Sequence, residues 1–282
     1  MVNINGQLLD ASETGLSTTN RGLLYGDAVF ETLRYSGDKI FFWEDHYFRL
    51  MATMRQLRME IPMTFTPELL EAEIVKTIQS SNLQKSSCRV RITVWRASGG
   101  KYTPESREVE YMIEAEPLQL PFYTISDAPC EVELFKDHFL YSGSLSTLKT
   151  NNRLVNILGS IYAEENEYQN CLLLNENKMV VEALNGNIFL VNGYKIKTPP
   201  LSDGCLKGIM RKQVMGILME LPDYVLEEDT VSPFELQKAD EIFITNVVTG
   251  ITPVTQYRKK SYGNKVAKEL LARLNVTARF NK

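Results

Sequence analysis

The segment Pro117-Leu118-Gln119-Leu120-Pro121 divides this chain of 282 residues near its middle. Each proline fixes its own φ and disfavours helix in the residue before it, so the segment predicts an extended connection. Domains usually hold roughly 100–200 residues, so a break at this position predicts two of them. We expect a smaller N-terminal α+β domain over residues 1–116, a linker over 117–122 and a larger C-terminal domain over 123–282.

The hydrophobic pattern predicts both helices and strands in each half. The first half is expected to contain hairpins at Asn5-Gly6 and Gly37-Asp38, helices over 44–57 and 67–79, and strands over 88–95 and 108–113. The second half is expected to contain helices over 151–167 and 206–218, and strands over 171–174, 179–182, 188–191, 194–198 and 241–245.

The charge balance and the hydropathy limit the partners that this chain can have. The 31 Lys and Arg residues against 35 Asp and Glu give a formal charge of −4, which predicts no nucleic-acid partner. No run approaches the ~20 apolar residues of a membrane span, and the first residues lack the regions of a signal peptide. We therefore expect a cytoplasmic protein with no membrane partner.

Residues that build metal sites and hydrolytic triads are scarce. Four cysteines lack CxxC spacing, and the two histidines, His46 and His138, have no clustered ligand partners. No metal is therefore expected, and a Ser-His-Asp triad is difficult to build. Demanding chemistry would then require a cofactor.

Several motifs occur in one order along the chain. They are Arg21-Gly22, Tyr25-Gly26-Asp27-Ala28-Val29-Phe30-Glu31-Thr32, His46 with Arg49-Leu50, Leu148-Lys149-Thr150-Asn151-Asn152-Arg153-Leu154, Val181-Glu182-Ala183-Leu184-Asn185-Gly186-Asn187-Ile188-Phe189, Ile196-Lys197-Thr198 and Leu206-Lys207-Gly208-Ile209-Met210-Arg211. Together they resemble the fold type IV pyridoxal-phosphate enzymes, the class IV aminotransferase family, over nearly the whole chain. The resemblance implies an enzyme that uses pyridoxal 5'-phosphate. It also implies a two-domain architecture of mixed α+β and α/β type, like D-amino-acid aminotransferase, with a cofactor-binding C-terminal domain.

The resemblance assigns the central roles to Lys149 and Glu182. Lys149 would bind the cofactor aldehyde covalently and then move the substrate α-proton. Glu182 would keep the pyridine nitrogen protonated, which makes the ring an electron sink. Leu184 departs from the family pattern, which usually has a small residue there, and we expect it to affect packing on one side of the ring.

Further residues match the family's phosphate-binding groups. Arg49 would grip the phosphate with its guanidinium fork, although it could instead be a helix-surface arginine. Ile209 and Met210 would offer backbone N–H groups at the start of a helix. Thr245 and Asn246 match the remaining phosphate-contacting pair, or are simply a polar strand end.

Three residues are candidates for substrate binding. Phe30 matches a position that lines the substrate pocket, although it could equally belong to the core. Arg96 and Lys101, around Ser98-Gly99-Gly100, could bind a substrate carboxylate from a loop that in this family can serve the neighbouring subunit. The alternative is a flexible basic hairpin tip.

The subfamily features favour 4-amino-4-deoxychorismate lyase, which releases pyruvate and 4-aminobenzoate and belongs to folate biosynthesis. They are Asn-Asn-Arg-Leu after Lys149, the Gly-Ile-Met-Arg helix start, and the segment Arg96 to Tyr102. Against them, Lys101 replaces the lyase arginine in that loop. A branched-chain or D-amino-acid transaminase that uses 2-oxoglutarate is the alternative, and a non-catalytic relative that binds the cofactor or a metabolite is a third.

The resemblance also implies a homodimer, in which a loop of one chain closes the site of the other. Closed two-fold dimers are the commonest soluble assembly. The aromatic cluster Phe41-Phe42-Trp43 with Tyr47-Phe48 could contribute to the contact, or could lie in the first domain's own core.

Overall fold

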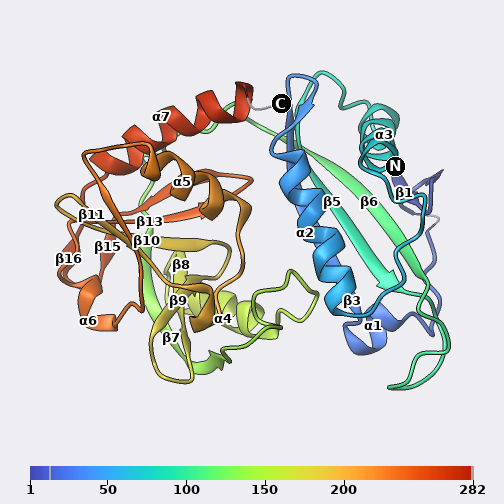
Figure 1. The fold of residues 1–282 in the computed structure, drawn as a ribbon, viewed down its shortest axis with the longest axis horizontal. Helices are drawn as coiled ribbons and strands as arrows, with labels where there is room; N and C mark the ends of the chain where they lie inside the picture. The colour runs from blue at the N-terminus through green and yellow to red at the C-terminus, as the bar shows by residue number, and fades with distance from the viewer. Residues whose placement is uncertain (13, 281–282) are drawn as a thin grey trace. The chain divides into compact units, whose positions relative to one another are not determined.

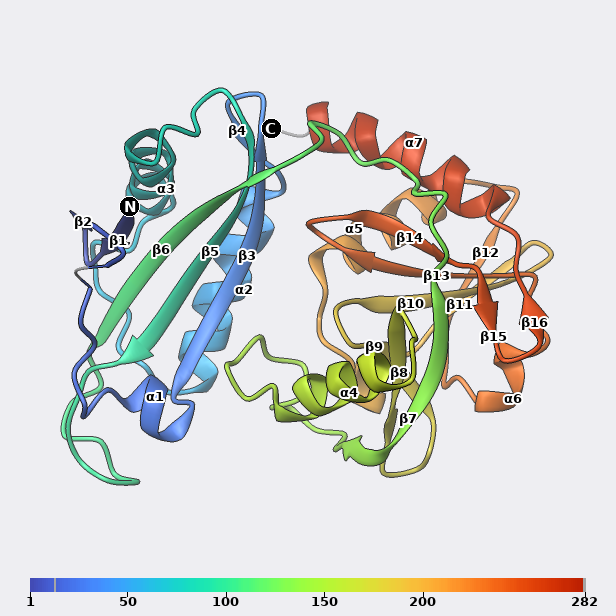
Figure 2. The same ribbon diagram turned by 180° about the vertical axis from the view of Figure 1, so that it is seen from behind.

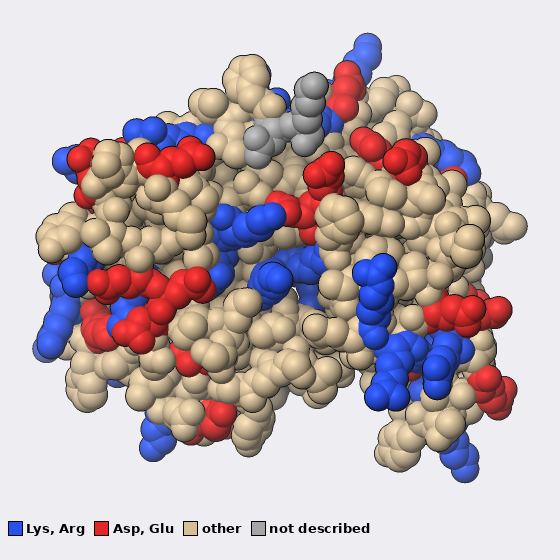
Figure 3. Space-filling model, viewed as in Figure 1, with Lys and Arg blue, Asp and Glu red and all other residues tan. Residues whose placement is uncertain are grey.

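The computed structural model describes residues 1–12 and 14–280, and it contains two compact units. The first unit comprises Met1–Phe122 together with Lys149–Asn152, and the second comprises Tyr123–Leu148 with Arg153–Lys282. Within the described ranges, no helix combines the length and the hydropathy that crossing a bilayer requires. Acidic and basic side chains are interspersed on the surface that Figure 3 shows, as the near balance of the two signs leads one to expect.

The first unit is an antiparallel six-stranded sheet with two helices, α2 and α3, packed on one of its faces (Figures 1 and 2). The strand order is β2-β1-β6-β5-β3-β4. Its elements are β1 (Val2–Ile4), β2 (Gln7–Leu9), α1 (Arg21–Tyr25), β3 (Ala28–Ser36), β4 (Lys39–Ile40), α2 (Trp43–Gln56), α3 (Pro67–Ser80), β5 (Ser87–Arg96) and β6 (Val109–Leu118). Both predicted hairpins and both predicted helices are confirmed.

Strand β6 continues to Leu118, two residues into the segment that the prolines predicted to be a connection. Its neighbour β1 pairs with it only near Ile113, whereas β5 pairs with it as far as Leu118. Beyond Ile113 the strand therefore has a partner on one side only, and a strand edge tolerates proline.

The apolar core of the first unit lies between the sheet and its two helices. Val29 and Leu33 of β3 are fully buried there, packed in one cluster with Met54 of α2 and Ile74 of α3. Because successive strand residues point to opposite faces, the intervening Phe30 lies on the other face of the sheet. This alternation leaves one face apolar and makes the other available for polar side chains.

The second unit contains two five-stranded sheets whose buried residues form one shared core. The strand orders are β12-β11-β10-β13-β14 and β16-β15-β7-β8-β9. Its elements are β7 (Glu131–Leu140), α4 (Leu154–Glu165), β8 (Asn170–Asn175), β9 (Val180–Ala183), β10 (Asn187–Asn192), β11 (Lys195–Thr198), a 3₁₀ turn (Leu201–Asp203), α5 (Ile209–Met219), β12 (Val225–Glu228), α6 (Pro233–Leu236), β13 (Glu241–Asn246), β14 (Gly250–Val254), β15 (Gln256–Tyr257), β16 (Lys260–Ser261) and α7 (Lys265–Phe280). Helix α4 packs against β7 and β8, while α5 and α7 pack together near β13 (Figure 2).

The two helices predicted in the second half exist but begin later than expected. The first was predicted from residue 151 and starts at Leu154, because residues 149–151 extend along β3 instead. The second was predicted from residue 206 and starts at Ile209, after Gly208 as its N-cap. All five short strands predicted in this half are present as β8, β9, β10, β11 and β13.

Candidate active site

The backbone of Lys149 is held against β3 by antiparallel hydrogen bonds. The N–H of Phe30 donates to the Lys149 carbonyl at 2.9 Å, and the N–H of Asn151 donates to the Ala28 carbonyl at 3.0 Å. Val29 and Thr150 form the bridge between these two bonds. The segment is therefore a short additional strand, which fixes where the Lys149 side chain starts.

The Lys149 side chain and a second cation share the ring of Phe30. Lys149 Nζ lies 4.3 Å from the ring centroid and Arg91 Cζ lies 3.9 Å from it, so the two cations are within about 8 Å of each other. Arg91 donates to two neutral oxygens, Thr93 Oγ1 at 3.1 Å and Asn151 Oδ1 at 3.3 Å. Burial, with the nearby Arg89, lowers the pKa of Arg91 although Glu114 opposes this. Glu114 lies opposite Arg91 on β6, but Arg91 forms no ion pair with a carboxylate among the described residues. An amine and a partly buried cation of this kind can together bind an anionic substrate.

Sequence reasoning missed Arg91. Arg91 and Thr93 lie opposite Thr32 and Phe30 of β3, which makes Arg91 a diagonal neighbour of Phe30 on the polar face. The available signal was the alternation along β5, in which Arg89, Arg91 and Thr93 alternate with the apolar residues Val90, Ile92 and Val94. That signal also fits a solvated sheet face, so only the pairing register distinguishes the two.

Arg49 is paired with a buried carboxylate of β3. Its Nε and Nη2 donate to Glu31 Oε1 and Oε2 at 2.7 and 2.6 Å, and the Glu31 residue is 1% exposed. His46 Nδ1 lies 2.7 Å from Glu31 Oε2, and its ring is fully buried. Burial raises the pKa of Glu31, but the charge and hydrogen bonds of Arg49 and His46 outweigh it and lower that pKa to about 2. Glu31 is therefore an anion, and Nδ1 of His46 is the donor.

In the second unit, Glu182 lies where β9 meets the loop that leads into α5. It is 5% exposed, and its Oε2 accepts the backbone N–H of Leu206 at 2.8 Å. Asn187 of β10 holds the same loop, because its Nδ2 donates to the Leu206 carbonyl at 2.9 Å. These bonds place a buried carboxylate beside the start of the helix.

The N-terminus of α5 carries the two predicted backbone donors, Ile209 and Met210. Both residues are buried, and no side chain caps the helix at Gly208. A Cβ at Gly208 would overlap Asn187 Oδ1, so only glycine allows this close approach. The first N–H groups of a helix have no intrahelical acceptor and favour an anion.

Thr245 and Asn246 differ in what their side chains do. The β10–β13 register sets Thr245 opposite Asn187, and Thr245 Oγ1 lies 3.5 Å from the Asn187 carbonyl. The Asn246 Oδ1 accepts from the N–H groups of Val248 and Thr249 at 3.0 and 2.9 Å, so it shapes the turn after β13. Thr245 therefore belongs with the loop before α5, whereas the Asn246 amide oxygen is engaged locally.

Leu184 packs towards helix α4. A Cβ at Gly159 would lie 2.5 Å from Leu184 Cδ2, and Asn156 Nδ2 donates to the Leu184 carbonyl at 2.8 Å. The leucine thus occupies space that the missing side chain at Gly159 leaves open. This contact explains how the second unit accommodates the larger residue.

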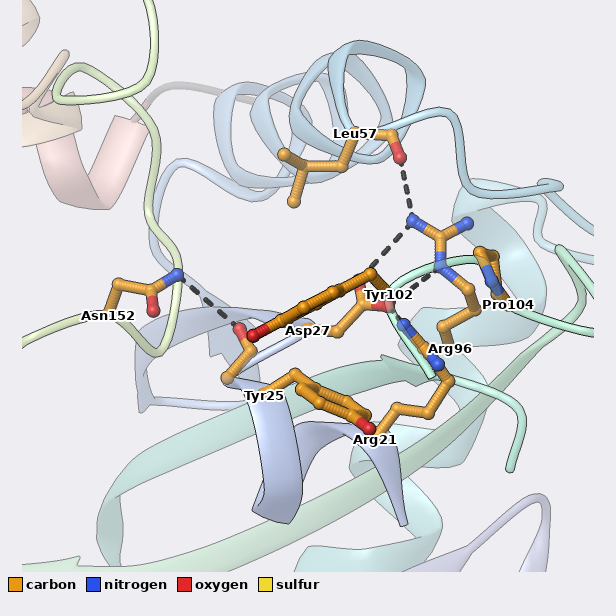
Figure 4. Close-up of a pocket in the computed structure, with 9 residues that line it drawn as sticks. Arg21, Tyr25, Asp27, Leu57, Arg96, Tyr102, Pro104 and Asn152 are labelled. Carbon is orange, nitrogen blue, oxygen red and sulfur yellow. Dashed lines mark hydrogen bonds and ion pairs between the residues drawn. The ribbon is translucent and has the colours of Figure 1, made fainter. Parts of the chain in front are cut away.

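The structure anchors Arg96 within the first unit. Its Nε donates to Asp27 Oδ2 at 2.9 Å, and its Nη2 donates to the Leu57 carbonyl at 2.7 Å (Figure 4). Its Nη1 donates to the Arg58 carbonyl at 3.1 Å. The residue is 7% exposed. Its three nitrogens are therefore engaged in holding the loop after β5.

Lys101 lies on that loop with an exposed side chain. Its carbonyl accepts from Arg21 Nη1 at 2.6 Å, and Arg21 Nε also donates to Asp27 at 3.0 Å. The neighbouring Tyr102 is 91% exposed, and its ring centroid lies 5.9 Å from that of Tyr25. Both tyrosines line a pocket of about 360 Å³ (Figure 4). The loop is thus held by its backbone, and the Lys101 ammonium projects from it.

Each unit by itself carries groups that suit a part of pyridoxal phosphate. In the second unit, an uncapped helix N-terminus and the Thr245 hydroxyl suit a phosphate, and a buried carboxylate suits a protonated ring nitrogen. In the first unit, a lysine amine suits an aldehyde. The structure brings Phe30 together with Lys149, and Glu182 together with the loop into α5.

Comparison with known proteins identifies the family. The model of the family described as Amino-transferase class IV matches residues 28–257. The chain is similar to a solved branched-chain aminotransferase from Thermoproteus uzoniensis, described with norvaline, with a TM-score of 0.84 and 25% identity. The match covers 98% of this chain and 93% of that protein. The chain belongs to the class IV aminotransferase family and has the architecture of the fold type IV pyridoxal-phosphate enzymes.

Its relatives include both reaction types of that family. A Methanocaldococcus jannaschii protein, provisionally named a branched-chain-amino-acid aminotransferase, is 28% identical over 96% of this chain and 92% of its own length. An aminodeoxychorismate lyase of Vibrio harveyi is 23% identical over 86% of this chain and 88% of its own length. D-alanine aminotransferases recur among the other relatives at 23–26% identity.

We predict that burial of His46 makes the stability of this protein fall as the pH falls below about 6.5, the usual histidine pKa. Burial lowers the pKa of His46; the hydrogen bond and charge of Glu31 oppose the shift, and the charges of Arg49 and Lys149 add to it. Its Nε2 has no hydrogen-bond partner among the described residues, so a proton there would be buried without an acceptor. Below that pH the unfolded chain binds a proton at His46 that the folded chain does not bind. The free energy of unfolding therefore falls by up to about 1.4 kcal/mol per pH unit.

The measurement is urea unfolding of wild type and His46→Gln between pH 7.5 and 5. The free energy of unfolding of wild type should fall more steeply than that of the variant, down to the folded-state pKa of His46. His138→Gln, at an exposed histidine, should keep the wild-type slope. Equal slopes for wild type and His46→Gln would contradict the prediction.

Proposed function

We propose that this chain is an amino-acid transaminase that acts on branched-chain or D-amino acids with 2-oxoglutarate as the acceptor. Aminotransferases of these two classes outnumber lyases among the relatives given above. The loop feature that favoured the lyase loses weight as well, because Arg96 is engaged by Asp27 and two carbonyls. The transaminase alternative is therefore preferred over the lyase that the sequence features favoured.

The observation that carries the proposal is the pair of cations at the Phe30 ring. Arg91 would bind the substrate carboxylate, since its two hydrogen-bond partners are neutral. Lys149 Nζ would then remove the α-proton of the amino donor and, in the second half of the reaction, deliver a proton to the α-carbon of the acceptor. Phe30 would keep water away from the amine by covering it with an apolar ring.

The other residues would hold the cofactor, which supplies an electron sink when bound. Glu182 would keep a proton on the ring nitrogen, and its bond from the Leu206 N–H holds its carboxylate in position. Arg49, Thr245, Asn246 and the backbone of Ile209 and Met210 would bind the phosphate; for Asn246 only the backbone is offered, since its amide oxygen shapes the turn.

The decisive experiment offers the purified protein a panel of L- and D-amino acids with 2-oxoglutarate, and separately aminodeoxychorismate. We expect glutamate and the matching keto acid from branched-chain or D-amino donors, and no 4-aminobenzoate. Lys149→Ala should abolish product formation. Release of pyruvate and 4-aminobenzoate would support the lyase instead, and a yellow protein that is inactive with every donor would support the non-catalytic alternative.

We predict that Glu182→Gln keeps the cofactor but loses activity by a factor of about 10² or more. The amide oxygen can still accept the Leu206 N–H, so the loop before α5 is preserved. The amide cannot hold the ring nitrogen protonated, however. Cofactor content by visible absorbance and turnover with the preferred donor check this, and a coloured, fully active variant would remove Glu182 from the mechanism.

We further propose that the protein is a homodimer whose contact includes helix α4. This helix exposes a stripe of apolar side chains at helical spacing, Leu154, Ile157, Leu158 and Ile161, which are 73, 53, 41 and 45% exposed. No charged residue occurs between Leu154 and Ala163, so the stripe is complementary to itself. A two-fold axis would set two α4 helices antiparallel, with the C-terminal carboxylates of one near the N-terminus of the other.

The aromatic cluster considered from the sequence is a weaker candidate for this contact. Phe41 and Phe42 are 4 and 8% exposed, and Trp43 and Tyr47 pack against the core of the first unit. Only Phe48, at 62%, remains exposed. The cluster therefore belongs mainly to that core.

Light scattering coupled to gel filtration should give about twice the chain mass of 32.2 kDa for the active protein. Ile157→Glu should shift the mass to that of one chain, because it places a charge in the apolar stripe. Met219→Glu, at an apolar residue outside the stripe that is 73% exposed against 53% for Ile157, is the control and should stay dimeric. An active wild-type protein of 32.2 kDa would refute the dimer.

A further inference from the structure

The buried group Glu31, His46 and Arg49 forms a closed hydrogen-bond set on the helix-covered face of β3. Oε1 of Glu31 accepts from Arg49 Nε, and Oε2 accepts from both Arg49 Nη2 and His46 Nδ1. The three distances lie between 2.6 and 2.7 Å. Both carboxylate oxygens are therefore occupied by N–H donors, and two of these bonds fix the plane of one guanidinium.

Two contacts along one edge determine the orientation of a planar guanidinium, because both Nε and Nη2 are held at once. Arginine has five N–H groups, and Glu31 uses only two of them. The side chain of Arg49 is 11% exposed against 2% for that of Glu31, so the guanidinium lies at the boundary of the buried region. The buried carboxylate thus aims an arginine whose remaining edge is turned away from it.

We propose that Glu31 is a positioning residue for the cofactor phosphate, acting by holding Arg49 in the orientation that grips the dianion. The proposal rests on the proposed role of Arg49 and extends it to a residue that does not touch the cofactor. Without Glu31, Arg49 would have to order its flexible side chain on each binding event, which lowers affinity. His46 contributes by donating Nδ1–H, which fixes the Glu31 carboxylate itself.

Glutamine cannot replace Glu31 in this arrangement. Its amide offers one acceptor oxygen and one NH₂ group, whereas both oxygens of Glu31 accept from N–H groups of Arg49. In either orientation the NH₂ group of glutamine would therefore face an N–H group of Arg49. Aspartate keeps the charge but is one methylene shorter and reaches only part of the set. The two substitutions therefore separate the charge from the geometry.

The experiment compares the affinities of the cofactor-free protein for pyridoxal 5'-phosphate and for pyridoxal, which has the same ring and aldehyde but no phosphate. In Glu31→Gln the affinity for pyridoxal phosphate should fall at least about tenfold, while that for pyridoxal stays within about twofold. Glu31→Asp should fall between wild type and Glu31→Gln. Titrations followed by visible absorbance give both constants without any measurement of turnover.

A purely structural role for Glu31 would weaken both ligands together, and that outcome would overturn the proposal. If Glu31→Gln fails to fold, Glu31→Asp decides by the same ratio. Asp27→Asn is the matched control, because Asp27 is the other carboxylate of this unit that joins two elements through arginines, Arg21 and Arg96. It should lower stability without changing the ratio of the two affinities.

The same titration separates this proposal from the proposed role of Arg49. Arg49→Ala should lower the preference for pyridoxal phosphate over pyridoxal at least as much as Glu31→Gln does, while the start of α5 still binds the phosphate. If that variant keeps the preference, Arg49 does not bind the phosphate and the proposed function of this residue fails. If Arg49→Ala lowers the preference and Glu31→Gln keeps it, Arg49 stands and the positioning role of Glu31 is refuted.

Discussion

The antiparallel pairing of residues 149–151 with the start of β3 is the interaction on which the candidate site depends. The segment lies 27 residues beyond Phe122 in the chain, yet it belongs to the first unit through bonds to Ala28 and Phe30. Backbone hydrogen bonds fix a register, and a register fixes which side chains become neighbours. Lys149 therefore meets the Phe30 ring because the main chain is paired there, whatever the intervening loops do.

The five residues from Asp27 to Glu31 concentrate three separate tasks. Asp27 accepts from Arg21 and Arg96 and so anchors the loop after β5. The backbone of the next three residues pairs with the lysine segment. Glu31 then anchors α2 through Arg49 and His46. A buried charge is costly unless it is paired. Asp27 and Glu31, at the two ends of this stretch, therefore each favour the position in which their arginines stay paired with them.

Local patterns predicted most of the fold, because hairpin turns and amphipathic helices depend on residues that are close together in the sequence. The hairpin at Asn5-Gly6 and the helix over 67–79 are examples. Two of the missed elements depend on distant partners, because β7 and β15 pair in parallel although more than a hundred residues separate them. The helix α7 and the hairpin strands β14 and β16 were also missed, although their patterns or partners are local. In the candidate site, the roles assigned to the motif residues stay predictions, whereas the Glu31 contacts and the nearness of Arg91 to Lys149 follow only from register and packing.

The loop Arg96 to Tyr102 shows why a sequence motif need not distinguish the reaction types of one family. Gly99 and Gly100 have φ of +112° and +75°, and a Cβ at either would meet Glu105 or the Thr103 carbonyl. Arg96 and both glycines are thus required by the path of the loop itself. Residues that the loop path itself requires therefore do not indicate which reaction takes place. The side chains close to the Lys149 amine in the first unit are Phe30 and Arg91, and we propose these as the better candidates for determining the reaction type.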